Sequence, residues 1–117
     1  MTKKARLTYK GHKFILDLEV VKGLKRIFGL MFSSREKTKP LLFDFEKMTT
    51  RPIHSLFVFF PFVVIWLDDN NKIVDFKLVK PFSFSVSPSR PYTKLIEVPL
   101  NRQYSKIMKI LVGDRKV

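Results

Sequence analysis

The chain contains no cysteine, and this absence removes several kinds of chemistry at once. It excludes a disulfide framework, a thiolate metal site and a cysteine nucleophile. Four glycines are too few to build a phosphate-binding loop, and neither the P-loop pattern, nor the dinucleotide-binding pattern, nor the GxSxG pattern of serine hydrolases is present. The two histidines, His12 and His54, have no metal-binding spacing. We therefore expect no metal ion and no cofactor.

Long apolar runs are also scarce. The longest, 56–67, has twelve residues, whereas a membrane-spanning helix needs about 20. Pro61 would break a helix at its centre, and the β-branched and aromatic residues around it favour two buried strands joined at the proline. The alternative is a segment that lies on a membrane surface. The N-terminal residues lack the apolar core and cleavage site of a secretory signal, so the expected compartment is the cytoplasm.

What the chain does contain is enough apolar material for one core, since 45% of its 117 residues are hydrophobic and 12 are Phe. We expect a single domain over residues 1–117, with residues 1–10 as a candidate flexible basic N-terminus. The lysine-rich composition with a single Gln is typical of heat-adapted proteins.

Apolar and polar residues alternate along much of the chain, which predicts strands. The turn sequence Asp-Asp-Asn-Asn at 68–71 predicts a hairpin. Helical spacing predicts short helices at 21–32 and 102–107, the second capped by Asn101. The fold class is mostly β (α+β), a curled sheet or partly closed β-barrel of about seven short strands with one or two short helices. The predicted strands are 10–20, 41–45, 53–59, 62–68, 72–80, 92–98 and 110–112.

Three blocks of sequence occur in a characteristic order. The first is Gly29-Leu30-Met31, the second is 53–68, in which His54-Ser55, Pro61 and Asp68 match, and the third joins 95–98 to Gly113-Asp114. In this order they resemble the domain-of-unknown-function 192 family, a group of small bacterial and archaeal proteins. The resemblance implies a compact β-rich domain with no established activity. It also marks a candidate family-motif site, made of His54, Ser55, Pro61, Asp68, Gly113 and Asp114.

The chain departs from that family pattern in its middle block. Where the family has an Asp two positions after the proline, this chain has Val63, and where the family has a polar Lys-Asn pair it has Leu56-Phe57. If those polar residues line a site in the family, this chain lacks part of it.

Basic residues outnumber acidic ones by 23 to 10, which gives a net charge of +13, and 11 of the 23 lie within residues 1–39. Cationic side chains grouped in this way can displace counterions from a polyanion. The alternative is a solvated basic surface without a ligand. Tyr9 and Tyr92 are candidate stacking residues. The candidate polyanion-binding residues are Lys3, Lys4, Arg6, Lys10, Lys13, Lys22, Lys25, Arg26, Arg35, Lys37 and Lys39.

Three functions remain open from the sequence. The first is a non-catalytic binding module with an unidentified partner, and the second is binding of nucleic acid or another polyanion through the basic N-terminal face. The third is a hydrolytic or sugar-handling enzyme, which would require Asp44, His54 and Glu97 to meet in a barrel mouth. We expect binding without catalysis, and the oligomeric state stays open.

Overall fold

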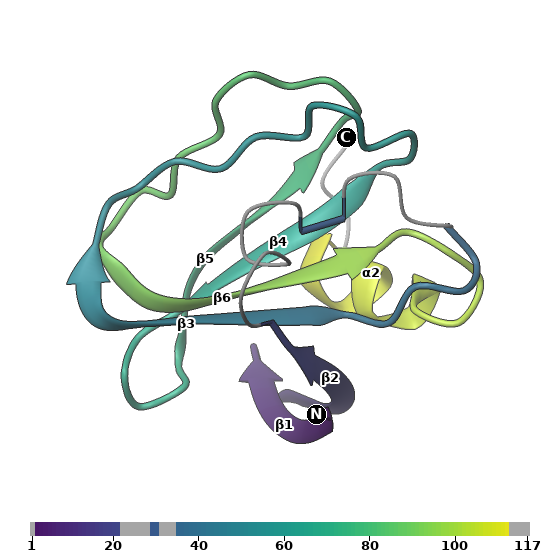
Figure 1. Cartoon of the computed structure of the whole chain (residues 1–117). Helices are drawn as coiled ribbons and strands as arrows, with labels where there is room; N and C mark the ends of the chain where they lie inside the picture. The colour runs from purple at the N-terminus through teal and green to yellow at the C-terminus, as the bar shows by residue number, and fades with distance from the viewer. Residues whose placement is uncertain (1, 22–28, 31–34, 113–117) are drawn as a thin grey trace.

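The computed structural model describes residues 2–21, 29–30 and 35–112, and these residues form one curled six-stranded sheet and one short helix (Figure 1). The mostly β, curled-sheet fold predicted from the sequence is confirmed. No helix in the described ranges is long and apolar enough to span a bilayer. The elements are β1 (Thr2–Tyr9), β2 (His12–Val20), β3 (Leu41–Thr49), β4 (Phe62–Leu67), β5 (Ile73–Val79), β6 (Tyr92–Pro99) and α2 (Ser105–Val112).

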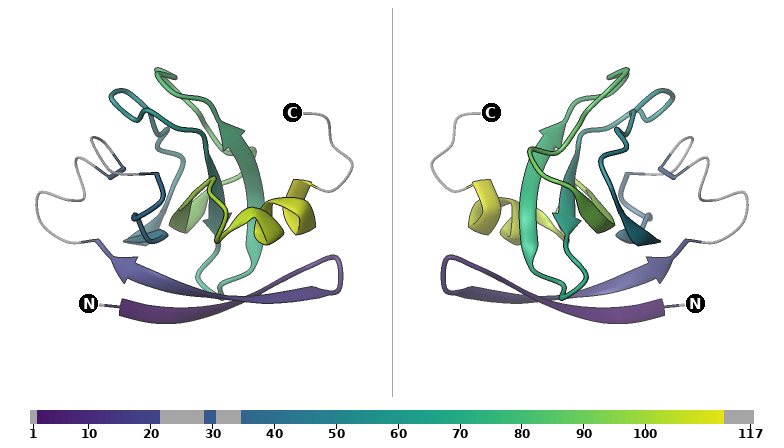
Figure 2. Two further views of the ribbon diagram at one scale, coloured as in Figure 1. Left: turned by 90° about the vertical axis from the view of Figure 1, so that its right-hand side faces the viewer. Right: turned by 90° about the vertical axis from the view of Figure 1, so that its left-hand side faces the viewer.

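The strands are arranged in the order β1-β2-β3-β6-β4-β5. All neighbours are antiparallel except β2 and β3, which pair in parallel over a short stretch. The β1–β2 hairpin crosses one end of the molecule (Figure 2) and brings β1 close to β5. There the rings of Tyr9 and Phe76 meet edge to face with centroids 5.0 Å apart. The sheet therefore curls into a half-barrel.

Each face of this sheet carries its own core, because side chains alternate along every strand. On the first face, the β1–β2 hairpin and α2 cover Val63, Ile65 and Ile96. On the second face, Val64, Trp66 and Leu95 pack with residues of the connecting segments. Strand β4 is buried along its full length, since its alternate residues contribute to both cores.

Three sequence predictions differ from the structure. Residues 53–59 do not form a strand, because only Ile53 makes an isolated bridge, to Val86. Residues 110–112 belong to α2 rather than to a strand, since Ile107 and Leu111 of α2 pack on the first core. Strand β1 was not predicted at all. The helix predicted at 21–32 falls largely outside the described residues.

Candidate functional site

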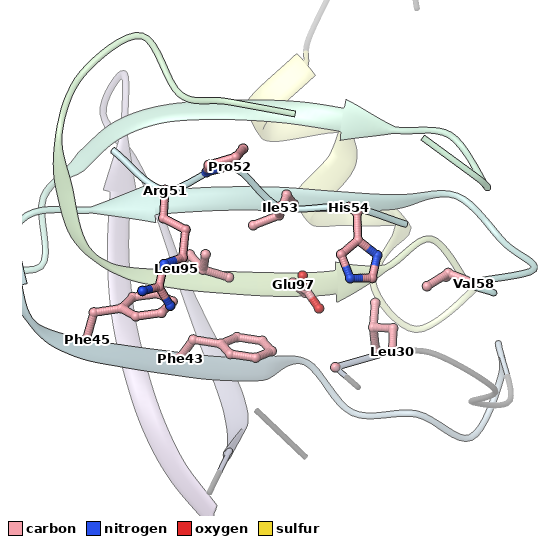
Figure 3. A pocket seen from close by; sticks show the side chains of 11 residues that line it. Leu30, Phe43, Phe45, Arg51, Pro52, Ile53, His54, Val58, Leu95 and Glu97 are labelled. Carbon is pink, nitrogen blue, oxygen red and sulfur yellow. The ribbon is translucent and has the colours of Figure 1, made fainter. Parts of the chain in front are cut away.

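A cavity of about 140 Å³ opens on the second face of the sheet, between β3 and β6 on one side and residues 51–58 on the other (Figure 3). One water molecule needs roughly 10–15 Å³ measured in this way, so the cavity has room for a small ligand. Its walls are largely apolar. Three ionisable side chains line it together with Gly29: Arg51, His54 and Glu97.

Glu97 is the unusual member of this group. It lies in β6 opposite Leu41 of β3 and Val64 of β4, so the strand register turns its side chain toward the second core. The residue is only 6% exposed. No hydrogen bond or ion pair of its carboxyl group is found within the described part of the chain. Desolvation by burial raises the pKa of Glu97 to about 8, so the neutral acid predominates at pH 7.

Gly29 leaves the space that the carboxyl group occupies. A Cβ atom at this position would lie 3.1 Å from Oε1 of Glu97 and 3.4 Å from the ring of Phe43. The backbone of Gly29 also has φ +54°, a conformation that disfavours side chains. Both observations favour glycine here, and they give a physical role to the first of the three sequence blocks.

Arg51 brings a positive charge to the cavity. Its backbone carbonyl accepts a 2.6 Å hydrogen bond from the hydroxyl of the buried Tyr92, which fixes the chain at this point. Its guanidinium lies over the ring of Phe45, 5.8 Å from the ring centre. No acid pairs with Arg51 among the residues that the structure describes. The cation therefore remains available to a ligand.

His54 completes the group and lies on the other side of Glu97 from Arg51 (Figure 3). Its Nδ1 accepts a 3.2 Å hydrogen bond from the backbone N–H of Leu56. An accepting Nδ1 places the proton of the neutral ring on Nε2. The cavity thus presents three hydrogen-bond donors at neutral pH: the guanidinium, the imidazole Nε2–H and the protonated carboxyl group.

The family-motif residues do not come together in one place. His54 lines the cavity, whereas Ser55 beside it is fully buried and structural: its hydroxyl donates to the carbonyl of Lys80 and accepts from the N–H of Ser83, both at 2.6 Å. Pro61 accepts a backbone bond from Leu100. Asp68 shapes the β4–β5 turn by accepting from the N–H groups of Asn70 and Lys72. Gly113 and Asp114 lie outside the described residues.

The catalytic trio of Asp44, His54 and Glu97 is not assembled, which corrects that hypothesis. Leu41 and Glu97 are opposite each other and share a face of the sheet, and Asp44 follows Leu41 by three positions. Alternation therefore directs Asp44 to the other face. Its Oδ1 accepts a bond from the N–H of Glu46, and its side chain is exposed.

The basic residues expected to bind a polyanion are spread over separate regions. On the outer face of the β1–β2 hairpin, the register places Lys4 opposite Asp17 and Thr2 opposite Glu19, so acids are interleaved with bases. Lys3, Arg6, Lys10 and Lys13 are exposed on the same hairpin, and Lys37 and Lys39 lie in the segment before β3. Arg35 donates to the carbonyl of Leu100. The remaining three, Lys22, Lys25 and Arg26, lie outside the described residues.

Neither of the two tyrosines offers a fully free ring for base stacking. Tyr9 packs against Phe76, as described above, and Tyr92 is completely buried between Trp66 and Phe45. Burial also raises the pKa of Tyr92, an effect that the nearby charge of Arg51 opposes. The assignment of Tyr92 as a stacking residue is therefore wrong.

Sequence reasoning identified His54 and Glu97 but missed the contribution of Arg51. Arg51 lies in a stretch without periodicity, between β3 and the apolar run, so no spacing pattern points to it. Its position at the cavity depends on the Tyr92 hydrogen bond, which joins residues 41 positions apart. No group of three His, Cys, Asp or Glu side chains in the described ranges is placed to hold a metal ion.

Comparison with known proteins assigns the chain to a family. The model of the domain-of-unknown-function 192 family, described as an uncharacterized ACR, matches residues 5–116. The chain belongs to this family. It is 33% identical to a UPF0127 protein of Pyrococcus furiosus over 91% of this chain and 90% of the relative. It is also 29% identical to a UPF0127 protein of Pyrococcus abyssi, over 79% and 76%. These thermophilic relatives agree with the heat-adapted composition.

Two solved structures share the fold. A candidate transcription regulator from Sinorhizobium meliloti superimposes with a TM-score of 0.73 at 17% identity, over 92% of this chain and 85% of that one. A protein of unknown function from Novosphingobium aromaticivorans gives a TM-score of 0.71 at 12% identity, over 92% and 79%. At these identities the likeness concerns the fold alone.

Proposed function

We propose that this protein is a non-catalytic binding module whose cavity takes a small ligand bearing a carboxylate. The observation that carries the proposal is the convergence of Arg51, His54 and the buried, uncharged Glu97 on one apolar cavity. A carboxylate has only acceptors, and each of these three groups offers a donor. The predicted cytoplasmic location stays part of this proposal.

Charge favours an anion over a cation in this cavity. The net charge of +13 attracts small anions and repels small cations. Within the cavity, Arg51 would add to that repulsion, while a protonated Glu97 offers a cation no counter-charge. A carboxylate could instead accept from Arg51 and from the Glu97 hydroxyl, and both are charge-assisted bonds of the stronger kind.

Binding of nucleic acid or another polyanion stays a prediction from the sequence. It requires a continuous cationic face, and on the outer side of the β1–β2 hairpin Asp17 and Glu19 interrupt one. A small anion needs only the local group of donors in the cavity. The structure therefore favours the small ligand.

The proposal is tested with matched sets of small compounds in which one skeleton carries a carboxylate, a primary amide or a primary amine, such as benzoate, benzamide and benzylamine. Calorimetry and chemical-shift mapping would measure affinity and position. We expect carboxylates to bind at the cavity and amines not to bind. Arg51→Gln should weaken carboxylate binding by about tenfold or more, because it removes a charged donor worth about 1.5–3 kcal/mol.

Two further variants sharpen the test. In the wild type, carboxylate binding should weaken toward pH 9, because Glu97 ionises above its pKa of about 8 and no longer donates. Glu97→Gln keeps a donor at the same place, so this variant should bind carboxylates at pH 7 and should not lose affinity toward pH 9. Gly29→Ala should weaken binding because its Cβ enters the cavity. Gly11→Ala is the matched control, since Gly11 also has positive φ but has open space around it. Amine binding that Glu97→Gln abolishes, or shifts that avoid the cavity, would contradict the proposal.

A further inference from the structure

Two connecting segments project side by side from the end of the molecule opposite the β1–β2 hairpin (Figures 1 and 2). They are residues 50–61, before β4, and residues 80–91, before β6. Backbone hydrogen bonds join Ile53 to Val86 in both directions, at 2.9 and 2.8 Å, and Ser55 bonds through its backbone to Phe82 and Ser83. The two segments therefore form one preorganised tip.

This tip exposes four phenylalanine side chains. Val58 and Phe60 of the apolar run point into the second core, whereas Phe57 and Phe59 point outward. The rings of Phe59 and Phe82 meet edge to face at 5.4 Å across the two segments. A cluster of large apolar side chains on a surface is informative because isolated ones are common but clusters are not. The exposed fractions are 49% for Phe57, 63% for Phe59, 49% for Phe82 and 82% for Phe84.

The backbone of the tip is strained at two of these phenylalanines. Phe57 has φ +59° and Phe82 has φ +62°, which is the left-handed region that bulky residues rarely adopt. Burial in a core cannot account for these conformations, since about half of each side chain is exposed. Strain of this kind collects at sites with a function.

Charge on the tip has one sign only. Residues 50–61 and 80–91 contain Arg51, Lys80 and Arg90 but neither Asp nor Glu. Two acids of the sheet lie against these segments: Glu97, which is buried at the cavity, and Asp75 of β5, whose carboxylate accepts from the N–H groups of Phe76 and Ser89 at the base of the tip. Exposed aromatic rings flanked by cations suit a partner that has an anionic outer layer and an apolar interior beneath it.

We infer that this aromatic tip docks on the surface of an anionic lipid bilayer, with the four phenylalanines entering the interface and Lys80 and Arg90 at the headgroups. Amphipathic protein surfaces bind bilayers through buried apolar area together with attraction to anionic lipid. A second copy of this chain is the less suitable occupant, because two molecules of net charge +13 repel each other and both tips carry cations alone. The inference goes beyond the proposed function, and it depends on side chains outside the cavity.

The test is sedimentation of the full chain with vesicles of phosphatidylcholine, with and without phosphatidylglycerol. We expect binding to the anionic vesicles only. Each fully inserted phenylalanine contributes roughly a factor of ten in affinity or more. Phe59→Ser/Phe84→Ser should therefore lower binding by at least about tenfold. Ile15→Ser is the matched control, because Ile15 is 60% exposed but lies on the β1–β2 hairpin, and it should bind like the wild type.

Three results would overturn the inference. The first is that the wild-type chain does not sediment with anionic vesicles. The second is equal binding by the wild type and the double variant, which would assign binding to basic residues alone. The third is a wild-type dimer that Phe59→Ser/Phe84→Ser converts to a monomer without any vesicle binding, which would make the tip a self-association surface. Phe84→Ser alone, at the most exposed position, preserves the Phe59–Phe82 contact and serves if the double variant does not fold.

Discussion

Glu97 differs from the other acids of the described chain in what surrounds its carboxyl group. Asp44, Asp68 and Asp75 each accept hydrogen bonds from backbone N–H groups. Glu97 instead faces apolar side chains and the glycine backbone at position 29. Desolvation is consequently the cause that raises its pKa, and the neutral acid follows from its place in the fold.

This environment makes stability depend on pH in an unusual direction. The folded pKa of about 8 lies above the ordinary value of 4.5, so between these values the folded chain holds a proton that the unfolded chain has lost. The contribution of Glu97 to the free energy of unfolding should therefore fall as pH rises from about 4.5 to 8 and level off above. Each pKa unit corresponds to about 1.4 kcal/mol, which gives a few kcal/mol in total.

Urea unfolding of the wild type and Glu97→Gln across this range measures the effect. The difference between the two curves isolates Glu97 from Arg51 and His54, which line the same cavity. We expect the variant to lose the decline toward pH 8. Parallel curves for the two proteins would show that Glu97 does not titrate in this window.

Sequence reasoning could name Asp44, His54 and Glu97 as chemical candidates, but it could not say which of the two acids lies beside His54. Asp44 and Glu97 both lie in strands that pair with each other. Which face each occupies depends on the register between β3 and β6, and a one-residue change of register reverses the assignment. That register is set by long-range packing, so the pattern of one strand does not reveal it.

Among the elements, the β1–β2 hairpin shows where local sequence determines structure. Its strands pair from Thr2 with Glu19 to Tyr9 with His12, joined by Lys10 and Gly11. Both turn residues have positive φ, 47° and 81°, as a tight two-residue hairpin turn of type I′ requires. Strand β1 was not predicted because five of its eight residues are polar. Only Ala5, Leu7 and Tyr9 face the core, which is too short an apolar pattern to indicate a strand.

Substitutions at Gly11 test this account of the turn. Gly11→Ala should lower the free energy of unfolding by about 1 kcal/mol, because a Cβ is strained at φ +81° even though no atom lies within 4 Å. Gly11→Asn should cost less, since Asn tolerates the left-handed region. Thermal and urea unfolding check the order glycine, then asparagine, then alanine. Equal stability of all three would contradict the turn geometry.

The apolar run shows the opposite case, in which local sequence misleads. Residues 56–60 have the composition of a strand, yet the backbone bonds that tie this segment to residues 82–86 come from Ile53 and Ser55 before it, as isolated contacts rather than a ladder. The side chain of Ser55 reaches the backbone of Lys80 and Ser83 and helps to hold this arrangement. Such a contact joins distant segments, so composition alone predicts a buried strand.

For the whole molecule, alternation predicts the half-barrel class but not its topology. The hairpin of β4 and β5 follows from its turn sequence. The insertion of β6 between β3 and β4, and the short parallel pairing of β2 with β3, do not follow from any local pattern. They arise because this order lets both faces of one sheet be covered, by the β1–β2 hairpin and α2 on one and by connecting segments on the other.

The same topology gives the two proposed binding surfaces different outlooks, although both use residues 50–61. The cavity of Arg51, His54 and Glu97 opens on the second face, the aromatic tip lies at one end, and the β1–β2 hairpin lies at the other (Figures 1 and 3). The net charge of +13 is therefore a property of the whole surface. Within the cavity, we propose that the protonation of a single buried acid selects the ligand.

The most direct test of this account is a titration of the Glu97 side-chain carboxyl by carbon NMR in the folded chain. Assignment would use Glu97→Gln, in which the signal should be missing. We expect a midpoint near pH 8, so that the acid is protonated at neutral pH and serves as a donor to a carboxylate. A midpoint near the ordinary value of 4.5 would show a charged carboxylate instead, and it would contradict the assignment of the cavity to anionic ligands.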